Sequence, residues 1–149
     1  MSGRIRALAL CLFSHRGRIL VNEAHDPVKE FTYCRPIGGG IEFGERAADA
    51  IKREILEELG ASIQNVRYVG TLENIFMYLG RPEHEIVLVF DGEFQDKGMY
   101  ERQFLEGNES DGQPFKAEWR ELSSFGTTVQ LVPEGLTELV RVHHARPSV

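Results

Sequence analysis

The chain has 149 residues, 42% of them hydrophobic and 27% charged, with a formal net charge of −6. This length and composition are typical of one globular domain that can bury a core, so we expect residues 1–149 to form a single domain. The negative charge argues against non-specific binding to duplex DNA or RNA, which requires a basic surface.

The sequence also argues against a membrane protein. No apolar run approaches the ~20 residues that span a bilayer, and no small-residue cleavage site follows the apolar segment behind Arg4 and Arg6. Cys11 and Cys34 each lie inside an apolar run, as buried free thiols of a reducing compartment do. We therefore expect a cytoplasmic protein with no membrane partner.

The first forty residues predict three strands. Residues 5–13 are almost continuously apolar, as in a strand covered on both faces. A polar turn around Gly17 leads into 18–21, so the first two strands are predicted to form a hairpin. The third, 31–37, delivers the chain into Gly38-Gly39-Gly40, which we interpret as a glycine-rich turn.

A helix is predicted next. Residues 47–59 contain neither Gly nor Pro and are rich in strong helix formers, and Gly60 follows as a typical left-handed stop. At 100° per residue the apolar positions share one face of this helix: Ala47, Ala48, Ile51, Ile55 and Leu59.

Three glutamates, Glu54, Glu57 and Glu58, share the flank of that face. Their mutual repulsion weakens an isolated helix, and a divalent cation would relieve it. Carboxylate oxygens suit Mg²⁺ or Mn²⁺. The competing interpretation is a solvated acidic face, partly neutralised by Lys52 and Arg53.

The remainder of the chain predicts further strands and a second helix. β-Branched and aromatic residues indicate strands at 66–72, 75–79, 85–94 and 115–122. Residues 95–114 are polar and predict a long loop. A short amphipathic helix follows Pro133, and the residues from Ala145 on are expected to fray. Strands, a central helix, more strands and a terminal helix predict an α/β (α+β) fold, a mixed sheet with helices on both faces.

The residues around the central helix have a distinctive spacing. Gly39, Glu45 and the run from Arg53 to Gly60 match each specified position but the last of G-x5-E-x7-R-E-U-x-E-E-x-G-U, where U is a bulky aliphatic residue. Ala61 occupies that last position, a departure that concerns only local packing. This pattern resembles the Nudix box, and 33–38 and 117–122 resemble the strand before the box and the last core strand of the Nudix (MutT-like) hydrolases.

The resemblance implies an α/β/α sandwich and an enzyme that hydrolyses a phosphoanhydride in a nucleoside diphosphate linked to another moiety, by metal-activated water. It implies that Glu54, Glu57, Glu58 and the Gly38 carbonyl bind Mg²⁺, for which Mn²⁺ could substitute. It makes Glu54 or Glu58 a candidate general base, and Arg53 an orienting residue that pairs with Glu57 or with Glu45 across the loop.

Two assignments stay open. In some family members the base is a glutamate on a distant loop, and Glu101, Glu106 and Glu109 are the candidates in 95–114. The substrate-binding candidates are Arg35, Gly39, Gly40 and Tyr78. Glycine permits close approach of backbone to phosphate, Arg35 could meet a phosphate or pair with a carboxylate, and Tyr78 could stack on a base or simply lie on the sheet.

Alternative functions also remain. A nucleoside triphosphate or oxidised-nucleotide pyrophosphatase and a dinucleoside polyphosphate hydrolase, the latter suggested by Tyr78, are neighbouring activities. A catalytically silent nucleotide-binding module is the alternative outside enzymes, and the intact carboxylate cluster counts against it. A small-molecule nucleotide is the expected partner, and a homodimer is an expectation from the family.

Overall fold

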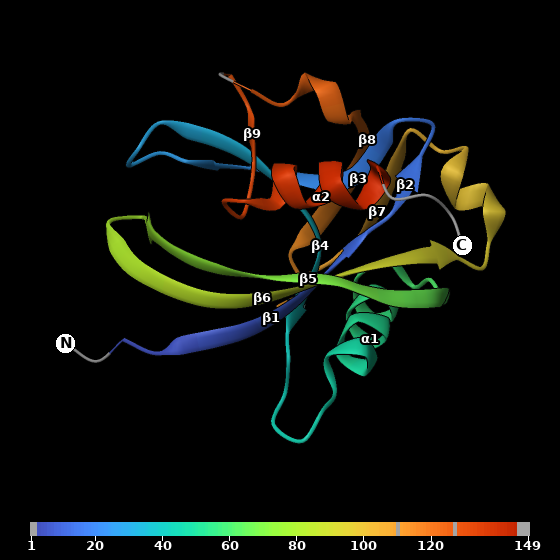
Figure 1. The fold of residues 1–149 in the computed structure, drawn as a ribbon, viewed down its shortest axis with the longest axis horizontal. Helices are drawn as coiled ribbons and strands as arrows, with labels where there is room; N and C mark the ends of the chain where they lie inside the picture. Colours follow the sequence, from blue (N-terminus) through green and yellow to red (C-terminus); the bar gives the residue numbers. More distant parts are fainter. Residues whose placement is uncertain (1–2, 110, 127, 146–149) are drawn as a thin grey trace.

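The computed structural model describes residues 3–109, 111–126 and 128–145. Figure 1 shows its elements in chain order, which are β1 (Ile5–Leu12), β2 (Ser14–His15), β3 (Arg18–Asp26), β4 (Phe31–Gly40), α1 (Ala47–Leu59), β5 (Ile63–Tyr78), β6 (Arg81–Phe94), the 3₁₀ helix η1 (Lys97–Tyr100), β7 (Phe104–Asn108), β8 (Pro114–Glu121), the 3₁₀ helix η2 (Leu122–Ser124), β9 (Gln130–Leu131) and α2 (Leu136–Ala145). The fraying predicted from Ala145 on does not include Ala145, which is the last residue of α2. The other residues that the prediction covers, 146–149, lie outside the described residues.

The strands form a mixed sheet in the order β5-β6-β1-β4-β3-β8-β7, with β2 against β3 and β9 against β4. β1 runs parallel to β6 and antiparallel to β4. β4 serves two neighbours in succession: its residues 31–36 pair with β3, and its residues 37–40 pair with β1. β4 therefore joins the part of the sheet around β3 and β8 to the part around β1 and β6.

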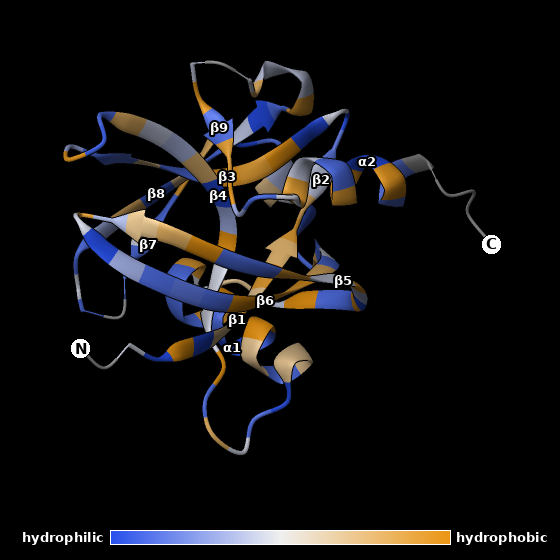
Figure 2. Cartoon of the chain, turned by 60° about the vertical axis from the view of Figure 1, so that its left-hand side comes forward, coloured by the Kyte–Doolittle hydropathy of each residue, from blue (hydrophilic) through white to orange (hydrophobic). Residues whose placement is uncertain are grey.

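Each helix covers a separate core. Ile51 and Ile55 of α1 pack with residues such as Phe90 and Trp119 in one buried cluster. Leu136 and Val140 of α2 pack in the other, and Figure 1 shows the two helices on opposite sides of β1, β5 and β6. Both helices carry hydrophobic and hydrophilic residues, as amphipathic helices do (Figure 2). The predicted mixed sheet with helices on both faces is confirmed.

The glycine triplet is not the turn that the sequence predicts. Gly38, Gly39 and Gly40 end β4 and pair with Leu10, Ala9 and Leu8 of β1. A Cβ at Gly38 would collide with the carbonyl oxygen of Ala9, so the missing side chain allows the two backbones to lie together. Glycine here serves close strand packing rather than chain reversal.

Three other expectations change. The predicted hairpin is much shorter than expected: β2 pairs with Arg18 and Ile19 at the start of β3, whereas β1 is separated from β3 in the sheet by β4. The predicted strands at 66–72 and 75–79 are one strand, β5, with register shifts near Val66 and Val69. The predicted loop 95–114 contains η1 and β7, because Met99 and Leu105 are buried anchors within an otherwise polar segment.

Cys11 and Cys34 are buried free thiols, as predicted. In the described part of the chain, no helix has the length and apolar character needed to cross a membrane.

Candidate active site

The helix that carries the glutamates has its predicted bounds, Ala47–Leu59. Gly60 adopts φ 64° and donates its N–H to the Leu56 carbonyl, which ends the helix as expected. The three glutamates differ in environment. The Glu54 side chain is 12% exposed and that of Glu57 52% exposed, while Glu58 is partly buried. Glu54 and Glu58 therefore form the inner part of the cluster, and Glu57 lies at its edge.

Arg53 organises this cluster. Its Nε and Nη2 donate to the two carboxylate oxygens of Glu45 at 2.7 and 2.9 Å, a bidentate ion pair across the loop. Its Nη2 also donates to the Gly40 carbonyl at 3.0 Å. Its Nη1 donates to Glu54 Oε1 at 3.0 Å and to Glu57 Oε2 at 3.3 Å. One guanidinium thus fixes the loop, the end of β4 and two of the three helix glutamates.

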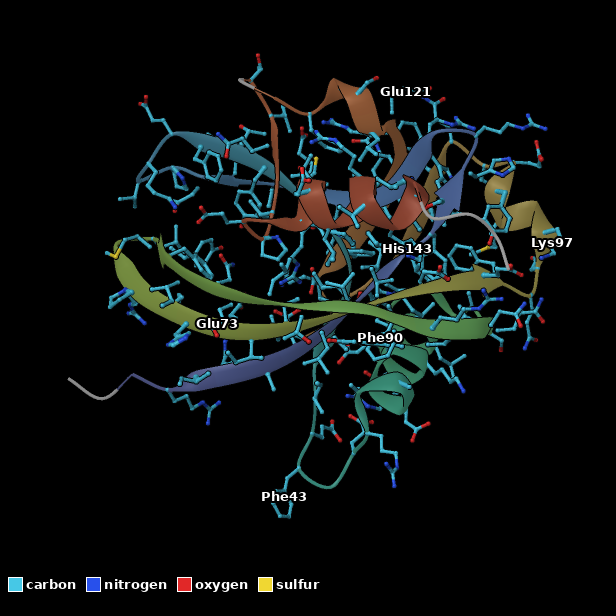
Figure 3. The ribbon with its side chains drawn as sticks, in the orientation of Figure 1. Phe43, Glu73, Phe90, Lys97, Glu121 and His143 are labelled. Atoms are coloured by element: carbon cyan, nitrogen blue, oxygen red, sulfur yellow. The ribbon has the colours of Figure 1, made fainter. Side chains whose placement is uncertain are left out.

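The pairing has an electrostatic consequence for Glu45. Hydrogen bonding from Arg53, together with the backbone N–H of Glu42, lowers the pKa of Glu45 to about 2. The pKa of Arg53 is raised in turn, chiefly by its hydrogen bonds to Glu45. Both groups are charged at neutral pH. In the same loop the Phe43 side chain is fully exposed and points away from the molecule (Figure 3).

Gly39 makes room for Glu54. A Cβ at Gly39 would lie 2.5 Å from Glu54 Cδ, so the carboxylate sits where a side chain would otherwise be. At Gly40 a Cβ would meet nothing within 4 Å. Of the two candidate phosphate-contacting glycines, Gly39 is therefore the one whose missing side chain shapes the carboxylate cluster.

Glu58 experiences the opposite effect from Glu45. Burial, followed by the neighbouring charges of Glu54 and Glu109, raises the pKa of Glu58 to about 8, and Arg35 acts in the lowering direction. Two carboxylates therefore crowd each other on one flank of α1. Arg35 from β4 and Glu109, after β7, both influence the pKa of Glu58. The sequence had left the roles of these two residues open.

The approach of Glu109 depends on β7, which sequence reasoning missed. A Cβ at Gly107 would collide with the Glu58 carbonyl oxygen, so β7 packs directly on the last turn of α1. Glu109 follows in a turn in which its N–H donates to the Gln113 carbonyl at 2.7 Å. An isolated glycine between Glu106 and Asn108 was the available signal for this close backbone approach. Of the other two candidate bases, Glu101 caps η1 and Glu106 lines a separate cavity.

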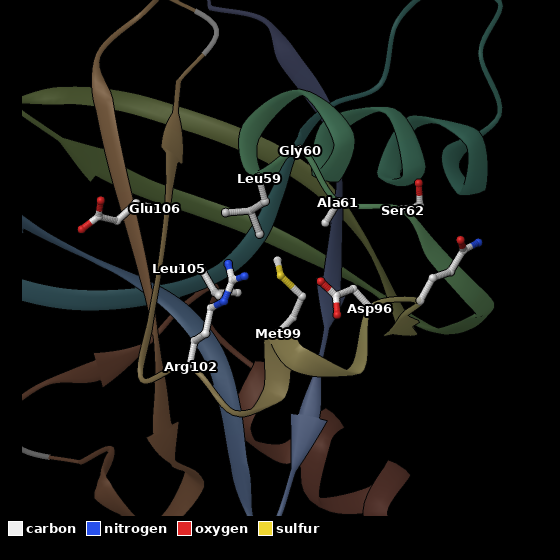
Figure 4. A pocket seen from close by; sticks show the side chains of 10 residues that line it. Leu59, Gly60, Ala61, Ser62, Asp96, Met99, Arg102, Leu105 and Glu106 are labelled. Carbon is white, nitrogen blue, oxygen red and sulfur yellow. The ribbon is translucent and has the colours of Figure 1, made fainter.

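That cavity, of about 410 Å³, lies at the C-terminal end of α1, against η1 and β7 (Figure 4). Its lining includes Leu59, Met99, Arg102 and Glu106. Glu54 and Glu58 are not among the lining residues. We place the candidate site at the carboxylates of α1, because the charged side chains gather there and the backbone at Gly39 leaves room for Glu54.

The donor set fits a divalent cation in part. Across residues 3–109, 111–126 and 128–145, no three acidic, histidine or cysteine side chains form a ready-made cation cage. Arg53 holds Glu54 and Glu57 on its own side. The crowded Glu54–Glu58 pair nevertheless offers hard oxygen ligands whose repulsion a cation would relieve, and Glu57, 52% exposed, would join them by giving up its 3.3 Å bond to Arg53.

The remaining predicted residue, Tyr78, ends β5 and is 38% exposed. Tyr78 lies next to Tyr33 of β4. The pKa of Tyr33 is raised, first by burial and then by the electrostatic effect of the neighbouring Tyr78. Tyr33 and Arg35 project on one face of β4 because they are two residues apart in a strand. Tyr78 is therefore next to Tyr33 on β4, and Arg35 on the same face of β4 is the residue that acts on Glu58 of the carboxylate cluster.

Comparisons with known proteins identify the family and the fold. The family model described as NUDIX domain matches residues 3–132. A MutT NUDIX hydrolase from Burkholderia pseudomallei is similar in structure, with a TM-score of 0.61 and 20% identity over 93% of this chain and 98% of that one. The ORF135 protein of E. coli gives a TM-score of 0.59 and 20% identity over 99% and 96% of the two chains.

A NUDIX hydrolase from Nitrosomonas europaea has a TM-score of 0.61 and 15% identity over 95% of this chain and 90% of that one. At these identities the three structures establish the fold. The match to the family model spans most of the sequence and includes the whole box. The chain therefore belongs to the Nudix family and is a pyrophosphohydrolase.

Proposed function

We propose that this protein hydrolyses a phosphoanhydride bond in a nucleoside diphosphate linked to another moiety, in a reaction that depends on Mg²⁺, with Mn²⁺ as a possible substitute. The observation that carries the proposal is the pair of crowded carboxylates, Glu54 and Glu58, beside the bidentate Arg53–Glu45 ion pair. A cluster of this kind costs stability unless a cation or a proton neutralises it.

Glu54, Glu57, Glu58 and the Gly38 carbonyl would hold the cation. When bound, it supplies neutralisation of the diphosphate charge and an acidified water. Arg53 keeps Glu54 and Glu57 in register through its hydrogen bonds.

The substrate side is formed by β4. The Arg35 guanidinium would bind a phosphate oxygen, and the backbone at Gly39 and Gly40 would allow that phosphate to approach closely. Tyr78 would contact the base. The proton of the attacking water would pass to a carboxylate whose pKa lies near neutral pH, where a general base is most effective. Glu58 has a pKa of about 8 in the metal-free protein, and a cation bound beside it would displace that proton and leave the carboxylate able to act as the base. Glu109 is the second candidate because it acts on the same group.

A turnover screen tests the proposal. Purified protein with Mg²⁺ would be offered nucleoside triphosphates, oxidised nucleotides, dinucleoside polyphosphates, nucleotide sugars and ADP-ribose. Glu58→Gln is the inactive comparison, and Glu73→Gln, an exposed glutamate on β5 (Figure 3), is the matched control. We expect one substrate class to be cleaved by the wild type and by Glu73→Gln but not by Glu58→Gln.

The products separate the related activities. Inorganic pyrophosphate with a mononucleotide indicates a triphosphate or oxidised-nucleotide pyrophosphatase, and two nucleotides indicate a dinucleoside polyphosphate hydrolase. Tight Mg²⁺-dependent binding of one compound with no turnover would contradict hydrolysis and favour the silent binding module.

A further inference from the structure

A buried carboxylate ties together two hairpins far from α1. Asp26, the last residue of β3, is 0% exposed. Its Oδ1 accepts from the Val28 N–H at 2.9 Å, within the turn that leads to β4. Its Oδ2 accepts from the Leu79 N–H at 3.1 Å, across to the β5–β6 hairpin. Figure 1 shows the ends of the two hairpins one above the other.

These hydrogen bonds keep Asp26 charged. Burial acts to raise the pKa of Asp26, but the N–H groups of Leu79, Val28 and Lys29 outweigh it, and the pKa is lowered overall. A buried carboxylate is tolerated only when its oxygens are satisfied in this way. Separation of the hairpins would leave a buried charge with an unfilled hydrogen-bonding site, so Asp26 opposes that separation.

The turn that Asp26 holds is strained. Tyr78 pairs directly with Arg81, which leaves Leu79 and Gly80 as a two-residue turn. Both have positive φ, 51° and 78°, as the turn type favoured in hairpins requires. Glycine adopts this conformation readily, but leucine does not. The bond from the Leu79 N–H to Asp26 therefore holds an unfavourable turn in place.

The strained turn adjoins a proposed substrate-binding residue. Tyr78 directly precedes Leu79 and lies next to Tyr33. Tyr33 in turn pairs with Ala24, two residues before Asp26. Both tyrosines are thus attached to the backbone segments that Asp26 joins, and Arg35 follows Tyr33 on the same face of β4.

We propose that Asp26 is a positioning residue for the nucleoside end of the substrate, because its bond to Leu79 fixes Tyr78 against β4, where the base of a nucleotide with its phosphates at Arg35 would meet it. This inference rests on the proposed function, in that Tyr78 and Arg35 contact the same ligand. It adds a residue that touches no substrate but sets the distance between two that do.

Asp26→Asn tests this role with little change in volume. The amide has one accepting oxygen in place of two, so it cannot accept from both the Val28 and the Leu79 N–H and the link between the hairpins is lost or weakened. The matched control is Asp96→Asn, because Asp96 accepts from the Gly98 N–H two residues on, within its own turn. The probes are the α,β-methylene analogues of ATP, GTP, CTP and UTP with Mg²⁺, whose dissociation constants are measured for each variant.

We expect Asp26→Asn to weaken binding of the preferred analogue by roughly tenfold, the usual effect of losing a charged hydrogen bond. Asp96→Asn should bind as the wild type does. In a Tyr78→Ala background Asp26→Asn should cause no further loss, because the positioned group is gone. With the cleavable substrate, KM should rise while kcat stays within about twofold.

Equal weakening in the wild-type and Tyr78→Ala backgrounds, or none in either, would overturn the proposal. So would a wild-type protein that binds none of the four analogues. A wild type that binds an analogue but cleaves no nucleotide would contradict the proposed hydrolysis alone, and the dissociation constants would still decide the role of Asp26. If Asp26→Asn does not fold, amide exchange decides: slower exchange at Leu79 when the wild type binds an analogue supports the proposal, and unchanged exchange refutes it.

Discussion

The carboxylate end of the molecule and the hairpin ends at Asp26 are both held by charged hydrogen bonds, but over different distances in sequence. At α1, Arg53 bonds to Glu45, Glu54 and Glu57, all within eight positions of it. At the hairpins, Asp26 bonds to Leu79, 53 positions away. The first arrangement can be predicted from the spacing of residues along the sequence, whereas the second pairs residues that come together only when the chain folds. We expect changes at α1 to affect chemistry, and changes at Asp26 to affect ligand position.

Glu58→Gln should have the largest effect on activity. It removes a candidate base and cation ligand, so we expect kcat to fall on the order of a thousandfold. Thermal stability should not fall near neutral pH, because Glu58, with a pKa of about 8, is mostly protonated there and the amide replaces one neutral group with another. Turnover and melting temperature would be measured together, with Glu73→Gln as the control. A parallel loss of stability would mean that Glu58 is structural, which would remove the contrast with Asp26.

The glycine triplet gives a graded second test. Gly39→Ala should keep the fold but cost roughly a hundredfold in kcat, because its Cβ would displace the Glu54 carboxylate. Gly38→Ala should instead destabilise the protein by about 1–3 kcal/mol or more, because its Cβ meets the backbone of β1.

Gly40→Ala is the internal control for stability alone, since its Cβ would meet no protein atom within 4 Å. Denaturation curves and turnover for the three variants would separate strand packing from site geometry. Similar behaviour of Gly38→Ala and Gly39→Ala would contradict the assignment of Glu54 to a precisely shaped site.

Arg53→Lys should have a smaller effect than either. Lysine keeps the charge but cannot bond to both oxygens of Glu45 and also to Gly40 and Glu54. We expect about a tenfold to hundredfold loss of Mg²⁺ affinity or turnover, as for other residues that orient ligands. Mg²⁺ titration of turnover would show it, and Lys52→Arg, at an exposed position of the same helix, is the control. An unchanged Mg²⁺ dependence would argue that Arg53 only holds the loop.

What the sequence could predict follows the same division. The structure confirms three predictions that depend on spacings within single segments of the chain. They are the bounds of α1, the Arg53–Glu45 pair and the covering of both faces of the sheet by helices. The contact of Gly107 with Glu58 and the bond of Asp26 to Leu79 join segments whose proximity no local pattern records. The glycine triplet was misinterpreted because glycine serves both turns and close strand packing, and only the neighbouring strand decides between them.

The last prediction concerns pH and has the smallest expected effect, melting-temperature shifts of a few degrees in metal-free protein. Glu45, with a pKa of about 2, favours the folded state in its charged form, so its contribution is present at neutral pH and is lost as the pH falls toward 2. Glu58, with a pKa of about 8, keeps a proton that the unfolded chain has released. Its contribution is therefore present in acid and is lost as the pH rises toward 8.

Melting temperatures across this range should separate the two carboxylates. Glu45→Gln should flatten only the acid side of the profile, and Glu58→Gln only the side that approaches pH 8. Mg²⁺ competes with the proton on Glu58, so its addition should stabilise the wild type more near pH 8 than near pH 6. An Mg²⁺ effect independent of pH would show that the cation is held without Glu58, and would transfer the proposed chemistry to Glu54, Glu57 and Glu109.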